Sequence, residues 1–296
     1  IGQVDYLCFT GSTATGRIVA RQCADRLIGC SLELGGKNPL LVLDDADIEQ
    51  TAAGAVRASF SNAGQLCVSA ERIFVADRLQ REFTDAFVAK TRAVRLGRSL
   101  DFEYEMGSLI SADQLARVES HVADARAKGA RVLTGGRRRP DLGPLFYEPT
   151  VLAGVTAEMA CYAEETFGPV VSIYPVRDET EAVRRANDSA YGLNASVWTG
   201  DPVRGRRVAA QLRCGTVNVN EAYAATFGSI DAPMGGMKSS GLGRRQGPEG
   251  LLRFVQPQVV GTQSLLPIAP SHGLSPQTFA SGLTVALRVL KSLGRA

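Results

Sequence analysis

The strongest constraint on the fold is a regular alternation of short apolar stretches with longer amphipathic ones between residues 30 and 219. Short stretches rich in Val, Ile, Leu and Phe indicate strands, and apolar residues at helical spacing indicate helices. We expect strands at 30–34, 40–43, 72–76, 131–134, 170–174, 194–198 and 215–219. We expect helices at 47–61, 79–94, 111–128, 179–187 and 202–212. This alternation predicts an α/β fold with a mainly parallel sheet covered on both faces.

The composition limits the class of protein. The 296 residues are 45% hydrophobic and 21% charged, which suits one large or two ordinary globular domains. Basic and acidic residues are interleaved and the net charge is only +3, so we expect no nucleic-acid or membrane partner. The sequence has no run of about 18 apolar residues and no signal-peptide pattern. We therefore expect a cytoplasmic location.

The six cysteines are scattered along the chain without a CxxC pair. This spacing favours free thiols in a reducing compartment over a disulfide framework, and no metal site is expected. Only two histidines are present, His121 in the charged helical run at 111–128 and His272 in a Pro-rich tail. A Cys–His dyad is not expected, so a catalytic cysteine would depend on a carboxylate as its base.

Cys67 lies in a small, polar, Gly-containing loop, residues 60–72, between an expected helix and an expected strand. Loops held by rigid elements often display reactive groups. A thiol is a strong nucleophile only as the thiolate, so catalysis would need a lowered pKa or a nearby base. Spacing alone leaves two interpretations open, a catalytic nucleophile and a buried structural cysteine.

Glu33 is flanked by Leu32 and Leu34 at the end of an expected strand, directly before a pair of glycines. Desolvation at such a position raises the pKa of a carboxyl group toward the range useful for a general base. A glutamate on an edge strand that faces water is the alternative.

The N-terminal region reads as a strand at 6–9, a turn at 10–13 and a helix at 14–26. Gly11 and Ser12 precede this helix, where exposed backbone N–H groups suit a phosphate. An ordinary capped turn explains the same residues. Because the chain begins at Ile1, at the edge of the apolar run at 4–9, we expect that an upstream part is missing.

Glycine and proline become frequent after residue 219. We expect a surface loop or linker at 233–243, where glycines would also let a substrate approach the backbone. A short helix at 248–254, an extended strand at 258–263 and a tail helix capped by Ser275 are expected to follow.

Four segments in order resemble the aldehyde dehydrogenase superfamily: 9–13 (FTGST), 32–37 (LELGGK), 62–67 (NAGQLC) and 164–170 (EETFGPV). Segments 194–198 and 241–244 agree with it as well, so the resemblance covers residues 1 to about 263. More narrowly, the chain resembles actinobacterial proteins assigned as succinate-semialdehyde dehydrogenases that use NADP. The resemblance implies an aldehyde dehydrogenase-like catalytic domain, preceded by the last strands of a truncated Rossmann-type cofactor domain.

The resemblance also implies a mechanism. Cys67 would add to an aldehyde to form a thiohemiacetal, whose oxyanion is held by backbone N–H groups that include its own. Hydride would then pass to NAD or NADP, and Glu33 would activate the water that hydrolyses the resulting thioester. The cofactor would lie against the family's positions at Gly11, Ser12, Leu34, Gly35, Glu165 and Phe167. The full-length form is expected to be a homo-oligomer that takes a small aldehyde.

On the same basis we expect three regions: a remnant of the dinucleotide-binding domain (1–35), a catalytic domain (36–255), and an oligomerisation strand with a helical tail (256–296). Two departures from known succinate-semialdehyde enzymes stand out. Ser61 replaces an arginine that can hold the substrate carboxylate, and Ser69 replaces a second cysteine. A general aldehyde substrate therefore stays open.

Two alternatives to oxidation of an aldehyde to the free acid are a CoA-acylating enzyme and an inactive remnant. In a CoA-acylating dehydrogenase the thioester passes to CoA, and Glu33 argues against this because such an enzyme has little use for a deacylating base. A truncated, inactive remnant is the non-enzymatic alternative. We expect the 296 residues alone to show no dehydrogenase turnover, because the family's upstream half supplies an oxyanion-hole asparagine and most of the cofactor site.

Overall fold

The computed structural model describes residues 1–263, 269–270 and 273–294. By its internal contacts the chain divides into two units, Ile1–Phe254 and a second unit that begins at Val255. The second unit contains the helix α10 (Pro276–Ser292), and the Ser275 hydroxyl caps it by accepting from the Thr278 N–H, as expected. Within the described residues, no helix combines the length and apolarity needed to cross a bilayer.

The expected strand at 258–263 is wrong for this chain. The structure gives these residues no strand pairing. A strand is defined by its place in a hydrogen-bonded ladder, and the sheets of the described residues include no strand at 258–263. Their role as an oligomerisation strand stays a prediction.

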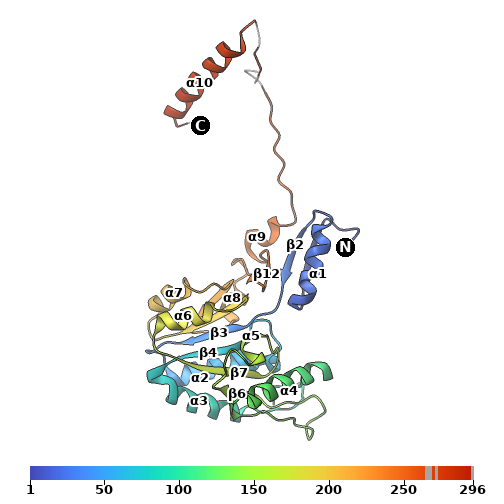
Figure 1. The fold of residues 1–296 in the computed structure, drawn as a ribbon, viewed down its shortest axis with the longest axis vertical. Helices are drawn as coiled ribbons and strands as arrows, with labels where there is room; N and C mark the ends of the chain where they lie inside the picture. Colours follow the sequence, from blue (N-terminus) through green and yellow to red (C-terminus); the bar gives the residue numbers. More distant parts are fainter. Residues whose placement is uncertain (264–268, 271–272, 295–296) are drawn as a thin grey trace. The chain divides into compact units, whose positions relative to one another are not determined.

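A seven-stranded sheet forms the centre of the first unit (Figure 1). Its strands, in spatial order, are β10 (Thr216–Val219), β9 (Asn194–Trp198), β3 (Asn38–Val42), β4 (Ala70–Ala76), β7 (Val170–Val176), β6 (Thr150–Ala153) and β5 (Arg131–Thr134). All neighbours are parallel except β5 and β6, which are antiparallel. The predicted α/β fold with a mainly parallel sheet is confirmed.

Helices cover both faces of this sheet. One face carries α6 (Glu179–Asn187) and α7 (Pro202–Ala209), and the other carries α2 (Ile48–Phe60) and α3 (Gln80–Ala93) (Figure 1). The remaining helical elements are α4 (Ala112–Ala127), α5 (Ala160–Ala163), α8 (Ala224–Gly228), α9 (Gly247–Leu252) and the short 3-10 turns η1 (Ser61–Gly64) and η2 (Asp77–Leu79). The predicted helices agree with these bounds to within a few residues.

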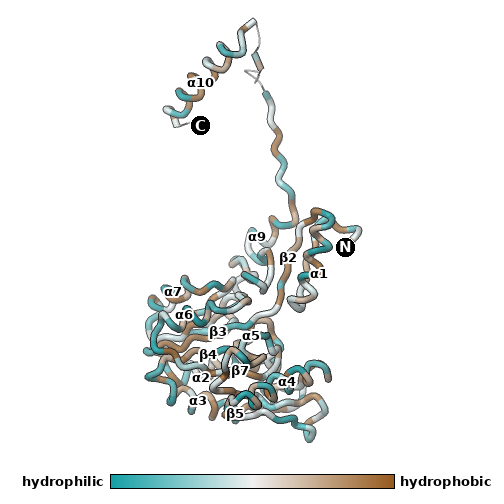
Figure 2. Tube along the Cα trace, in the orientation of Figure 1, coloured by the Kyte–Doolittle hydropathy of each residue, from teal (hydrophilic) through white to brown (hydrophobic). Residues whose placement is uncertain are grey.

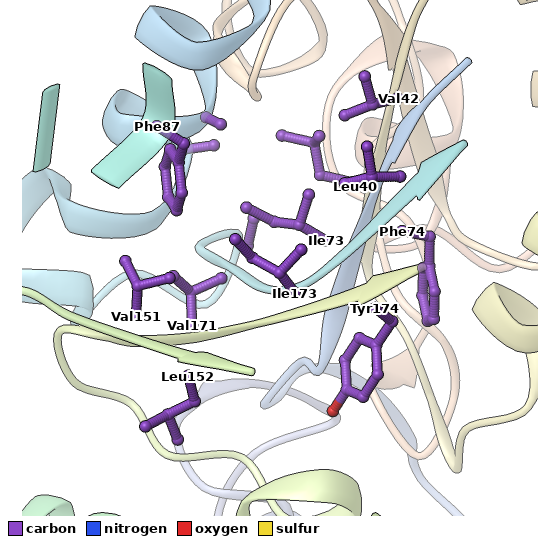
Figure 3. Close-up of a cluster of buried hydrophobic side chains, with 14 of the residues drawn as sticks. Leu40, Val42, Ile73, Phe74, Phe87, Val151, Leu152, Val171, Ile173 and Tyr174 are labelled. Atoms are coloured by element: carbon purple, nitrogen blue, oxygen red, sulfur yellow. The ribbon is translucent and has the colours of Figure 1, made fainter. Parts of the chain in front are cut away.

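The core lies on both sides of β3, β4 and β7. Leu40, Ile73 and Ile173 are essentially without solvent exposure, and Phe74 stacks on Tyr174 with ring centroids 5.3 Å apart (Figure 3). A parallel strand that is buried on both faces has a continuous apolar sequence rather than an alternating one. The hydrophobic residues of β4 and β7 can be followed in Figure 2.

A second, three-stranded sheet has the order β1 (Tyr6–Thr10), β2 (Gly29–Glu33) and β12 (Gly241–Leu242). The helix α1 (Thr13–Ala24) connects β1 to β2, which run parallel. The predicted loop at 233–243 in fact contains β11 (Met237–Lys238) and β12, which pair with β8 (Tyr191–Gly192) and β2. At Gly241 the φ is +145° and a Cβ would lie 1.9 Å from the Leu32 carbonyl oxygen, so glycine permits this pairing.

Candidate active site

The two sheets of the first unit present opposite strand ends to one cavity of about 440 Å³. The carboxyl ends of β1 and β2 lead into its wall at residues 10–14 and 33–35. The segments that precede β4 and β7 supply Cys67, Glu165 and Phe167. All eight residues expected at the site line this cavity: Gly11, Ser12, Glu33, Leu34, Gly35, Cys67, Glu165 and Phe167.

The backbone before Cys67 is tightly bent. Asn62 and Ala63 have φ values of 53° and 54°, and Gly64 follows with a φ of 69°. Left-handed conformations of non-glycine residues cost about 1 kcal/mol or more each, and they persist only where the surroundings enforce them. At Gly64 a Cβ would lie 2.1 Å from the Gly168 carbonyl oxygen. The chain therefore needs glycine here to bring the cysteine loop against the segment before β7.

Asn38, the first residue of β3, fixes the other end of the cysteine loop. Its amide nitrogen donates to the carbonyl oxygens of Cys67 and Ser69, both at 2.8 Å, and its oxygen accepts from the Asn194 N–H at 3.0 Å. The Asn194 amide in turn donates to the Val68 carbonyl. Two buried asparagines thus hold the backbone carbonyls of Cys67 and of the two residues that follow it. Neither asparagine was expected at the site from the sequence, although a polar residue at the start of an apolar strand was a usable signal.

A buried ion pair supports the segment that carries Glu165 and Phe167. Glu71 on β4 pairs with Lys37, and its carboxylate accepts from the Thr166 and Phe167 N–H groups at 2.9–3.0 Å. Removing one partner of such a pair leaves an uncompensated buried charge, so both residues are needed together. Neither residue was singled out from the sequence.

The helix α4 secures the carbonyl side of the same segment. Gln114 donates to the carbonyls of Thr166 and Phe167 at 2.9 and 2.7 Å, and Arg117 donates to the Glu165 carbonyl at 2.6 Å. Phe167 has a left-handed φ of 54°. The side chains of Gln114 and Arg117 also line the cavity, and so does Tyr191.

Glu33 is buried, with 8% of its surface exposed, and neither carboxylate oxygen has a hydrogen-bond partner among the described residues. Burial raises the pKa of Glu33 above its usual value, while the neighbouring Arg245, Arg244 and Arg253 oppose that rise. A carboxylate without fixed partners and with a raised pKa can accept a proton.

The Cys67 side chain is partly buried. Burial raises the pKa of its thiol, and the negative charge of Glu33 adds to this effect. Of the two conditions that catalysis could meet, a lowered thiol pKa or a nearby base, the first does not hold here. Glu33 lines the same cavity as Cys67 and is close enough to act on it electrostatically, so a carboxylate lies near the thiol.

Glu165 faces the cavity with one oxygen held by the Gly36 N–H at 2.7 Å. Burial raises the pKa of Glu165 to about 7. A Cβ at Gly35 would lie 2.3 Å from its other oxygen, so a side chain at that position would displace the carboxylate. Gly35 therefore keeps this wall of the cavity open.

His121 does not line the cavity. It is buried, and its Nδ1 lies 3.1 Å from the Thr166 hydroxyl oxygen, so it helps to hold the segment before β7. His272 lies outside the described residues. Ser61 begins η1 and does not line the cavity. In the part of the chain that the structure describes, no three metal-ligating side chains cluster together.

Comparisons with known proteins identify the family of the chain. The model of the aldehyde dehydrogenase family matches residues 2–260. A Mycolicibacterium smegmatis protein named "putative succinate-semialdehyde dehydrogenase (NADP+)" is 55% identical over 289 residues, which cover 98% of this chain and 56% of that protein. A Mycobacterium tuberculosis protein with the same name and the suffix 2 is also 55% identical, over 292 residues with the same coverage.

Solved structures give the same result. The Mycobacterium tuberculosis aldehyde dehydrogenase in complex with NAD+ superimposes with a TM-score of 0.83 at 40% identity, over 91% of this chain and 54% of that one. The Staphylococcus aureus betaine aldehyde dehydrogenase in complex with NAD+ gives 0.81 at 38% identity, over 87% and 53%. The chain thus spans about half the length of the relatives it matches. The chain belongs to the aldehyde dehydrogenase family.

Proposed function

We propose that this chain carries the nucleophile and the base for NAD(P)-dependent oxidation of an aldehyde to a carboxylic acid. One observation carries the proposal: the partly buried thiol of Cys67 lines the same cavity as the buried carboxylate of Glu33, which has no hydrogen-bond partner among the described residues. The family membership and the names of the relatives support it.

In the proposed reaction the Cys67 thiol gives its proton to the Glu33 carboxylate, which releases it to solvent. The sulfur then forms a bond to the aldehyde carbon, and the carbonyl oxygen becomes the oxyanion of a thiohemiacetal. The backbone N–H of Cys67 is proposed as one hydrogen-bond donor to that oxyanion. After oxidation the acyl group is a thioester on Cys67. Glu33 then takes a proton from water, the hydroxide adds to the acyl carbon, and the carbon–sulfur bond breaks to release the acid and the thiol.

The residues on the other wall fit a nicotinamide dinucleotide. Gly11 and Ser12 lie at the N-terminus of α1, where the Ser12 hydroxyl accepts from the Thr15 N–H and the helix dipole favours an anion. They would hold the pyrophosphate, while the Glu165 carboxylate would hold a ribose hydroxyl. Leu34, Gly35 and Phe167 would border the nicotinamide. When bound, the nicotinamide supplies the hydride acceptor.

The relatives' names support succinate semialdehyde as the aldehyde and NADP as the first cofactor to test, although Ser61 provides no cationic group for a carboxylate. We also propose that the full-length protein is a homo-oligomer in the cytoplasm, where its six cysteines, free in this structure, would stay reduced. Water, rather than CoA, is the proposed acyl acceptor, because Glu33 lines the cavity of Cys67 and its oxygens have no hydrogen-bond partner among the described residues.

The test uses Cys67 itself. The full chain is treated with iodoacetamide, with and without succinate semialdehyde, and alkylation is read for each cysteine by peptide mass spectrometry. Thiohemiacetal formation is expected to protect Cys67 and to leave the exposed Cys8 as reactive as before. Equal alkylation of Cys67 in the presence and absence of the aldehyde would contradict the proposal. The acylating alternative is tested by adding CoA once the thioester has formed. Transfer to CoA would give an acyl-CoA, whereas hydrolysis gives the free acid.

A further inference from the structure

Glu33 has one cationic neighbour at ion-pair distance among the described residues. The Nε of Arg245 lies 3.9 Å from the Glu33 Oε1, which is too long for a hydrogen bond. The two carboxylate oxygens and this Nε are all buried, and none of them has a hydrogen-bond partner in the described part of the chain. Two opposite charges with open hydrogen-bonding positions therefore face each other, and both act electrostatically on Cys67.

Arg245 is anchored without being neutralised. Its backbone exchanges two hydrogen bonds with Met234, each 2.7 Å long. Its Nη2 lies 3.2 Å from the Met234 sulfur, and the guanidinium stands 5.8 Å from the Phe227 ring centroid. A thioether and a ring face hold a cation but carry no compensating charge. Met234 also packs with Val68 in the apolar cluster beside Cys67, so the anchor of Arg245 is next to the cysteine loop.

The other two arginines near Glu33 donate hydrogen bonds to neutral groups. The charged and titratable groups around the Glu33 carboxylate are Arg244, Arg245, Arg253 and Cys67. Arg244 donates to backbone carbonyls at 2.8 and 3.1 Å. Arg253 donates to the Ser31 hydroxyl at 2.8 Å and to the Arg244 carbonyl at 3.0 Å. Arg245 is thus the guanidinium whose charge is directed at Glu33.

We propose that Arg245 is a positioning residue that holds Glu33 as a carboxylate and aims it at the acyl group on Cys67. The inference rests on the proposed function, because it assigns Arg245 a role in the deacylation step. The 3.9 Å separation leaves both Glu33 oxygens free to bind a water, while the opposite charge stabilises the ionised, basic form.

The step can be measured without a cofactor. p-Nitrophenyl acetate acetylates a reactive thiolate: the sulfur–acyl bond forms, and p-nitrophenolate leaves with the electron pair of the ester bond. Water then hydrolyses the thioester to acetate and the free thiol. Intact mass spectrometry of the acetylated full chain follows this hydrolysis. Its rate is expected to rise with pH through the pKa of Glu33, because only the carboxylate accepts the water proton.

Arg245→Met and Arg245→Gln remove the charge with different side chains. Each is expected to move the midpoint of this rise to higher pH, on the order of one unit, because the carboxylate loses its nearest cation. Arg245→Lys retains a cation and is expected to restore most of the midpoint. Arg244→Met, the matched control, removes a neighbouring charge outside ion-pair distance and is expected to shift the midpoint much less.

An unchanged midpoint in both charge-removing variants, with circular dichroism showing a folded chain, would overturn the proposal. A lower melting temperature with an unchanged midpoint would do the same, because it indicates a purely structural role. The variant Glu33→Gln distinguishes a failure of the proposed function from a failure of the role proposed for Arg245. If it abolishes the pH-dependent rise, the base role stands, and the Arg245 variants decide the inference. If Glu33→Gln has no effect, or if Cys67 is never acetylated, the proposed function itself fails and this inference fails with it.

Discussion

Asn38 gives the sharpest test of how the cysteine loop is held. The substitution Asn38→Ala deletes two hydrogen bonds to the carbonyls of Cys67 and Ser69 and one from the Asn194 N–H. Asn38 is only 2% exposed, so water cannot replace the lost amide without a rearrangement. The three partner groups would be left buried.

The cost follows from this count. A hydrogen bond contributes about 1 kcal/mol net, so three bonds correspond to about 3 kcal/mol of unfolding free energy. Asn38→Asp keeps the size of the side chain and the oxygen that accepts from the Asn194 N–H. Its second carboxylate oxygen would replace the amide nitrogen and face the carbonyl oxygens of Cys67 and Ser69. Burial and these carbonyls would raise the pKa of the introduced group, so the folded state would bind a proton that the unfolded state releases. We expect Asn38→Asp to lose more stability than Asn38→Ala near neutral pH and to recover part of it as the pH falls.

The assay is urea unfolding followed by the fluorescence of Trp198, the only tryptophan, which is buried on β9. Asn220→Ala is the matched control, because it removes two hydrogen bonds to the Thr199 backbone and none to the cysteine loop. Both alanine variants should lose stability, but only Asn38→Ala should change the alkylation rate of Cys67. A cost for Asn38→Ala below about 1 kcal/mol, or an Asn38→Asp stability that is independent of pH, would refute this reasoning.

Three further outcomes follow from the same structure. Gly64→Ala should lower the unfolding free energy by about 2 kcal/mol or more, because the φ is +69° and the new Cβ would meet the Gly168 carbonyl; an unchanged thermal melt would contradict this. Burial raises the pKa of Glu165 from 4.5 to about 7, so the folded chain retains a proton that the unfolded chain releases in this range. Stability should therefore fall as the pH rises from 4.5 to 7, and Glu165→Gln should flatten this slope in urea titrations at several pH values. Amides of the partly exposed β1 should exchange with deuterium faster than those of the fully buried β3; equal protection in exchange mass spectrometry would count against two sheets of unequal stability.

Most of the central sheet could be predicted from the sequence because its signal is local, although β6 was not among the expected strands. The predicted strands are rich in apolar residues, and the covering helices repeat their apolar residues at helical spacing. The same local signals marked Cys67, in a polar loop between two elements, and Glu33, between two leucines. Their meeting in one cavity depends on contacts between two separate sheets, which no local pattern encodes.

The supporting residues escaped prediction for the same reason. Glu71 holds the segment at 165–167, more than ninety positions away in the sequence, and Asn38 meets Asn194 across the sheet. Both act through hydrogen bonds that exist only in the folded chain. The two-residue strands β11 and β12 are too short to show any periodicity, so their segment was expected to be a loop. The segment at 258–263 shows the converse, because its sequence favours a strand and the structure assigns none there.

The central claim, that Cys67 and Glu33 act in succession on one acyl group, is tested most directly by the release of p-nitrophenolate from p-nitrophenyl acetate. The account predicts a rapid burst and then a slower steady release for the chain as it stands, a burst alone for Glu33→Gln, and neither phase for Cys67→Ala. A burst that survives in Cys67→Ala, or a steady release unchanged in Glu33→Gln, would contradict it.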